Sequence, residues 1–153
     1  MISPMLLFIA LACGTLATFA ARLLFNQVHH RKLMVLAREW KMHYAPDDRF
    51  ELAARVAERL PIPGAADVCV VDLIYGTEQG VRRYVFCAHY TTGVVRRKHR
   101  AKCVASLCEA PNREGGEWSG LVIAPPELSM LEQYRDASKR AQTPELVSTA
   151  PRS

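Results

Sequence analysis

The chain lacks the short motifs that mark most catalytic and cofactor sites. It has no glycine-rich phosphate loop, no GxSxG elbow, no HExxH helix and no paired carboxylates on a recognisable scaffold. Its five cysteines include no CxxC pair, which argues against a zinc ribbon and against a dense secreted disulfide framework. No period of about 20 to 50 residues repeats, which excludes a solenoid. We therefore predict a protein that is not an enzyme and that carries no cofactor and no metal.

Charged side chains are also missing from the beginning of the chain, where the first one is Arg22. The stretch from Pro4 to Ala21 is uncharged, and Leu23 to Phe25 extend it because the long side chain of Arg22 can reach the headgroups. About 22 residues at roughly 1.5 Å each match the hydrocarbon thickness of a bilayer. Residues 1–28 are therefore predicted to form a transmembrane anchor.

This segment could instead be a cleaved secretory signal or a lipoprotein signal, and two copies of the helix could pack against each other. A cleaved secretory signal would need a basic start, which "MISPM" lacks, and a lipoprotein signal would use Cys13, after which the chain stays apolar instead of turning polar. Ala10, Gly14 and Thr18 place small residues on one helix face, where a second copy of the helix would pack in a homo-oligomer. An alanine-rich span explains the same residues without an oligomer.

The flanks of the span predict its orientation. Basic residues gather within about 20 residues on the C-terminal side of the span and only the amino terminus lies on the other side, so the positive-inside rule places the N-terminus outside and the following domain in the cytoplasm. These residues are Arg22, Arg31, Lys32, Arg38 and Lys41.

Two helices are expected next. Residues 29–45 carry apolar side chains at helical spacing and are predicted to continue the span as a juxtamembrane amphipathic helix. Asp48 and Glu51 then form a capping-box pattern before an alanine-rich helix that Pro61, Pro63 and Gly64 end. Capping explains these acids better than a metal site does.

From Asp67 onward the pattern changes to strands. "DVCVVDLIY", "VRRYVFCAHY" and "VVRRKHRAKCVASL" are rich in β-branched or alternating residues and are separated by turns, which predicts an antiparallel meander of three strands with "LVI" as a fourth. A helix through Leu131 and Tyr134 follows. The fold class is α+β: an anchor, a small domain over 46–141 with two or three helices, and a disordered tail over 142–153.

The third strand presents a basic stripe. Four cations at alternate positions lie on one strand face, and they are the candidate binding residues: Arg96, Lys98, Arg100 and Lys102. A two-residue turn at Thr92 and Gly93 would place Phe86 opposite His99, so the aromatic row would join the apolar row in the core. One more turn residue would place Phe86 opposite Lys98, and aromatics would then interleave with cations as on a sheet that binds single-stranded nucleic acid. Burial of the aromatic surface favours the first register.

The same register separates the candidate metal ligands. Cys87 and His89 then point away from His99 and Cys103, so this hairpin alone cannot supply four zinc ligands. Each cysteine is better explained as a small buried apolar residue.

The order of the hydrophobic span, "WKMHYAPDDRF", "RVAERLPIPGAADVCVVDLIYG", "YVFCAHYTTGV" and a basic strand resembles a group of small, uncharacterised membrane-anchored bacterial proteins, notably from planctomycetes. The resemblance covers residues 30–107 and implies a single-pass protein of the bacterial inner membrane. It implies no catalytic residue.

The net charge of +5 and the pI of about 9.1 favour an anionic partner. The function expected is a cytoplasmic interaction or scaffolding module that is held at the membrane, with its basic strand face on anionic lipid headgroups or on an acidic protein partner. The alternatives are a nucleic-acid-binding domain tethered to the membrane, a zinc or thiol site, and a stripe that only solvates the outer face of a sheet.

Overall fold

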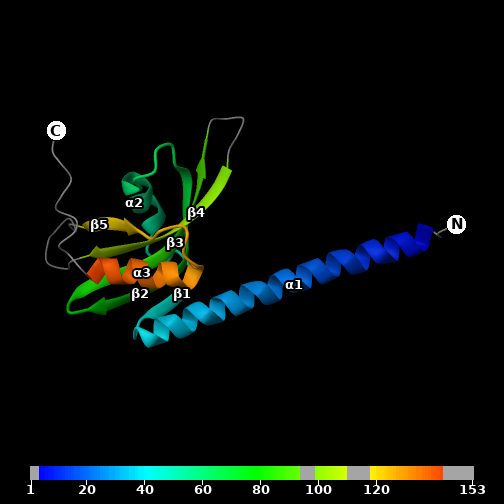
Figure 1. Cartoon of the computed structure of the whole chain (residues 1–153), viewed down its shortest axis with the longest axis horizontal. Helices are drawn as coiled ribbons and strands as arrows, with labels where there is room; N and C mark the ends of the chain where they lie inside the picture. Colours follow the sequence, from blue (N-terminus) through cyan, green and yellow to red (C-terminus); the bar gives the residue numbers. More distant parts are fainter. Residues whose placement is uncertain (1–3, 94–98, 110–117, 143–153) are drawn as a thin grey trace.

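The computed structural model describes residues 4–93, 99–109 and 118–142, and it confirms an α+β architecture with one long apolar N-terminal helix (Figure 1). The predicted disordered tail lies outside these residues except for Gln142. The elements, in chain order, are α1 (Pro4–Glu39), β1 (His43–Asp47), α2 (Leu52–Arg59), β2 (Ala66–Glu78), β3 (Val81–Thr92), β4 (His99–Glu109), β5 (Trp118–Ile123) and α3 (Met130–Gln142).

Helix α1 is unbroken over 36 residues, about 54 Å at 1.5 Å per residue. Figure 1 shows most of it projecting away from the rest of the molecule, with only its C-terminal end beside the sheet. Two hydroxyls in its projecting part are satisfied within the helix: that of Thr15 donates to the carbonyl of Ala12 at 2.9 Å and that of Thr18 to the carbonyl of Thr15 at 2.8 Å. In the described part of the chain, α1 is the one helix that is long and apolar enough to cross a membrane.

Helix α1 ends earlier than the apolar spacing predicts. Lys41 adopts a left-handed backbone conformation with φ 56°, and the amide of Met42 donates to the carbonyl of Ala37 at 2.8 Å. The chain then enters β1, where helix had been predicted through residue 45. Pro46 obscured this strand in the sequence, since proline cannot donate to a ladder and is tolerated only at an edge strand such as this one.

The sheet is a five-stranded antiparallel meander in the order β1-β2-β3-β4-β5, so it has slightly more strands than the three or four predicted. The additional strand is β1, which pairs through Ala45 with Leu73 of β2. The predicted strand "LVI" is the end of β5, which pairs with β4 through Ile123 and Ala105.

The β3–β4 register is neither of the two predicted, although the face assignment of the favoured one is correct. Thr92 pairs with His99, and Phe86 pairs with Ala105 instead of with His99, six residues further along β4. The connection is therefore longer than a two-residue turn. Because six is an even number, the aromatic row still shares a face with the apolar row of β4.

Helices cover both faces of the sheet. On one face α2 contributes Leu52 and Val56 to a core around Phe86, which has 0% of its surface exposed. On the other face α1 and α3 cover a second core in which Leu33 of α1 and Tyr134 of α3 are also 0% exposed. The C-terminal third of α1 is thus an integral part of the domain core.

Side-chain caps begin the two short helices. The carboxylate of Asp48 accepts the amides of Leu52 and Ala53 at 3.0 and 2.8 Å, so the predicted capping role of Asp48 is correct, whereas Glu51 makes no side-chain cap. At the start of helix α3 the hydroxyl and the amide of Ser129 both donate to the Glu132 carboxylate, at 2.6 and 3.0 Å. These hydrogen bonds lower the pKa of Glu132.

Candidate functional site

Asp72 lies at an irregularity of β2 where the sheet meets α1. The β2–β3 register shifts between Val71 and Ile74, and Asp72 adopts φ 53°, a left-handed conformation that aspartate tolerates better than most residues. Pro46 stands across from it on β1, between the pairs Ala45–Leu73 and Asp47–Val71, and has no N–H to donate. The Asp72 carbonyl accepts the hydroxyl of Tyr134 at 2.7 Å.

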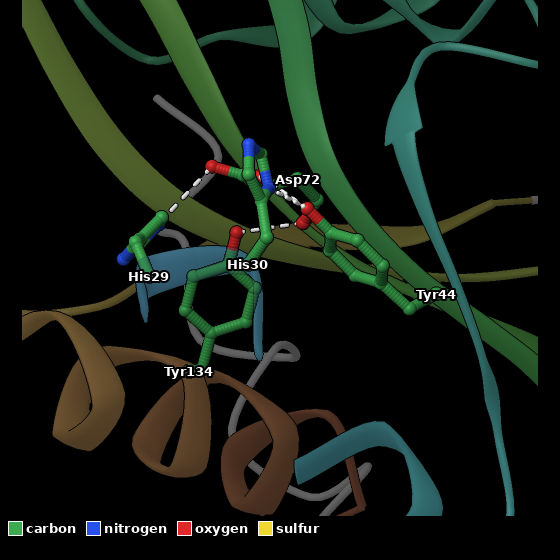
Figure 2. Close-up of polar contacts among 5 residues, drawn as sticks. All are labelled: His29, His30, Tyr44, Asp72 and Tyr134. Carbon is green, nitrogen blue, oxygen red and sulfur yellow. Dashed lines mark hydrogen bonds and ion pairs between the residues drawn. The ribbon is translucent and has the colours of Figure 1, made fainter. Parts of the chain in front are cut away.

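The Asp72 carboxylate gathers donors from two further elements, as Figure 2 shows. The hydroxyl of Tyr44 on β1 donates to Oδ1 at 2.7 Å. On α1, Nε2 of His29 lies 3.2 Å from Oδ2, and Nδ1 of His30 lies 3.2 Å from Oδ1 and against the Tyr44 hydroxyl. We call these five residues, His29, His30, Tyr44, Asp72 and Tyr134, the junction cluster, because they join α1, β1, β2 and α3.

The bonding pattern fixes where the protons of the junction cluster lie. A phenol has one proton, and Tyr44 gives it to Asp72, so Nδ1 of His30 must be the donor in its contact with the Tyr44 oxygen. An ionised carboxylate only accepts, so Nε2 of His29 also carries its proton.

Burial keeps the two phenols of the junction cluster protonated. It raises the pKa of Tyr44 far above the usual range, and the hydrogen bond to Asp72 and the nearby negative charge act in the same direction. The pKa of Tyr134 is also raised, first by burial and then by the charges around it. Asp72 itself is only 13% exposed, so its carboxylate is satisfied by protein donors more than by water.

The structure describes two of the four residues of the predicted basic stripe. Arg100 and Lys102 are exposed at the start of β4, where they pair across the sheet with Thr91 and His89. Arg96 and Lys98 lie outside the described residues. Beyond Lys102 the same strand face is buried under α3. There the hydroxyl of Ser106 donates to the Ala137 carbonyl of α3 at 2.7 Å.

The two described cations of the stripe lie on a known face of the sheet. Val104 belongs to the core beneath α1 and α3, and the β3–β4 ladder runs without a shift, so Arg100 and Lys102 lie on that same face. In Figure 1 the start of β4 lies on the side of the domain nearer the N-terminal half of α1. The exposed cations and the projecting helix are thus on one side of the molecule.

The predicted separation of the cysteines and histidines is also found. Cys87 packs in the core beneath α1 and α3 while Cys103 packs on the opposite face. Within residues 4–93, 99–109 and 118–142, no group of three or more His, Cys, Asp or Glu side chains is arranged so that it could hold a metal ion. Burial raises the pKa of the Cys87 thiol to about 12, so this thiol is not a nucleophile at neutral pH.

No protein-family model, no curated protein and no solved structure matches this chain.

The junction cluster was not predicted from the sequence. Asp72 lies in a predicted strand but was given no role, and Tyr44 lies in the segment predicted as helix, whereas the structure places it on β1. One signal was available, an aspartate inside the apolar run "VCVVDLIY" of β2. A carboxylate in such a run needs hydrogen-bond donors from the protein, and in the structure Tyr44, His29 and His30 lie around it.

Proposed function

We propose that the protein is a single-pass membrane protein without catalytic activity, which holds a small interaction module against the bilayer. The observation that supports this most strongly is the exposure of α1. The large apolar side chains that the structure describes between Met5 and Val28 are exposed, Phe8 by 71% and Phe25 by 76%. An apolar surface of this size is not stable in water and needs a cover, which lipid acyl chains would provide.

The proposed orientation has the N-terminus outside and the domain in the cytoplasm of a bacterial cell, at the inner membrane. The basic residues that follow the span support it through the positive-inside rule. The connection is rigid, because α1 continues without a break into the domain core. The module is therefore held at a fixed place on the membrane, unlike a domain on a flexible tether.

The partner proposed for Arg100 and Lys102 is the anionic headgroup layer of the same bilayer. These cations lie on the sheet face that α1 covers and at the end of the sheet towards which the helix projects, which favours lipid over a distant acidic protein. A basic residue near an anionic surface contributes about 1 kcal/mol, or roughly fivefold in occupancy.

Lysine reactivity tests this contact in the full chain. We expect the acylation rate of the Lys102 amine to be several-fold lower in nanodiscs with phosphatidylglycerol than in nanodiscs with phosphatidylcholine alone, and high salt to remove the difference. Arg100→Gln should weaken this protection about fivefold. Lys41, which follows the far end of α1, is the matched internal control and should react equally in both lipids.

Equal reactivity of Lys102 in the two lipids would contradict the headgroup contact. Protection of Lys102 by added single-stranded nucleic acid, with none from anionic lipid, would favour the nucleic-acid alternative instead. Tyr84 and Phe86, the stacking residues of that alternative, are buried in the opposite core at 4% and 0% exposure, so they are not available to a ligand on this face.

A further inference from the structure

We propose that a pocket between the end of α1, the β2–β3 hairpin and α3 binds a small organic anion, a carboxylate or phosphate that carries an apolar group. Its volume is about 440 Å³. Small-molecule sites typically have volumes of about 300 to 1,000 Å³. Figure 1 shows these three segments together on the side of the molecule away from the N-terminus. We call it the end pocket, and its proposed role does not rest on lipid contact.

A buried cation, Arg83 of β3, forms the floor of the end pocket. Its side chain is only 10% exposed, so water screens its charge poorly. One terminal nitrogen of the guanidinium donates to the carboxylate of Glu78, and the other reaches the carbonyl of Ser138 on α3 at 3.5 Å, the long end of the hydrogen-bond range. The second nitrogen is therefore weakly held by the protein and available to a better acceptor.

Gln142 occupies the position that an anion would take. In the orientation that satisfies both of its polar atoms, its side-chain oxygen accepts from the two terminal nitrogens of Arg83, at 3.0 and 3.3 Å. A carboxylate or phosphate at this position would instead make the bidentate, charge-assisted pair that guanidinium groups favour. Gln142 is exposed at the end of α3, so its side chain can turn away when such a ligand enters.

The charges around the end pocket favour an anion over a cation. Glu78 pairs with Arg83 and is 56% exposed. Glu39 of α1 lies 3.7 Å from Arg135 of α3 and is 54% exposed. Both carboxylates are thus paired and screened by water, and among the ion pairs within the described part of the chain none includes Lys139, which also lines the pocket. The poorly screened guanidinium and this lysine leave a positive potential inside.

Two apolar side chains, Trp40 and Met42, line the end pocket where the chain leaves α1, and both pack against the core beneath α1 and α3. Met42 lies directly on the backbone of β2, because a Cβ atom at Gly76 would come within 2.8 Å of its Cγ. The partly buried indole of Trp40 offers an apolar surface for a ring. This surface favours an organic anion over inorganic phosphate.

Binding of aromatic anions to the full chain in nonionic detergent micelles tests the end pocket. Trp118→Phe leaves Trp40 as the single tryptophan, so its emission reports on the pocket. We expect benzoate and phenyl phosphate to change this emission saturably. Benzamide and benzylamine present the same ring without the negative charge, and they should bind at least about tenfold more weakly, because hydrogen bonds to charged groups are the stronger ones.

Two variants in this background locate the anion. Lys139→Gln should weaken the binding of benzoate about tenfold, and Gln142→Glu should weaken it at least as much, because the new carboxylate occupies Arg83 itself. The matched control is Arg140→Gln. Arg140 follows Lys139 on α3 but pairs with Asp136 at 2.8 Å outside the pocket, so its loss changes the net charge equally and should leave the affinity unchanged. The three substituted residues are exposed, which leaves the core intact.

The absence of saturable binding by both anions would overturn the end pocket as an anion site, and so would equal binding of benzamide. Affinity that is unchanged in Gln142→Glu would show that the ring binds to the micelle or elsewhere on the chain. An equal loss in Arg140→Gln would reduce the effect to net charge. Since no anionic lipid is present, these outcomes are independent of the contact proposed for Arg100 and Lys102.

Discussion

Asp72→Ala is expected to destabilise the domain by about 3 kcal/mol. The substitution removes the acceptor of the Tyr44 hydroxyl and of both histidines, and a buried donor left without a partner costs about 1 to 3 kcal/mol. Alanine is also less stable than aspartate at φ 53°. Urea unfolding of the full chain in detergent micelles, followed by tryptophan fluorescence, should show a midpoint lowered by roughly 2 M for a slope of about 1.5 kcal/mol/M.

The matched variant is Asp72→Asn, which keeps the shape of the side chain and one acceptor oxygen. It should cost about 1 kcal/mol, because one donor contact and the charge are lost. An alanine variant as stable as the wild-type chain would show that the junction cluster does not hold the four elements together.

Phe86→Ala is expected to cost about 3 to 5 kcal/mol, since a fully buried phenylalanine leaves a cavity at the centre of the α2 core. The control is the same substitution at Phe25, which is 76% exposed on the projecting part of α1. Phe25→Ala should change the stability of the domain by less than about 0.5 kcal/mol. Both are measured by the same urea titration. A cost below about 1 kcal/mol at Phe86 would mean that the aromatic row faces solvent, as in the register with interleaved cations.

The sequence predicted the features that depend on local chemistry. Residues 4–25 have to form an apolar helix in any context, Asp48 is a cap wherever a helix follows it, and the alternation along β3 and β4 shows which residues share a face. The exact partners across the sheet were not predictable, because a register shift of two, four or six residues preserves every face. Only the length of the connection distinguishes these registers, and the sequence "TTGVVRRKH" does not define where its strands end.

The junction cluster was unpredictable for a different reason. Its members come from residues 29, 30, 44, 72 and 134, and only the packing of α1 and α3 on the same sheet face brings them together. The strand β1 was the key omission. Once Tyr44 is placed on a helix, nothing in the sequence directs its hydroxyl to Asp72, whereas on β1 it lies within 2.7 Å of that carboxylate.

The central proposal is that α1 crosses the membrane and holds the domain on its cytoplasmic side, and cysteine accessibility tests it most directly. Cys13 lies within the span and Cys69 is exposed on the domain. We expect a membrane-impermeant maleimide to leave both cysteines unmodified in intact bacterial spheroplasts. Once the membrane is permeabilised, the reagent should modify Cys69 but not Cys13. The chain should still carry its N-terminal residues in both samples. Modification of Cys69 in intact spheroplasts, or recovery of a soluble chain that has lost the span, would contradict the account.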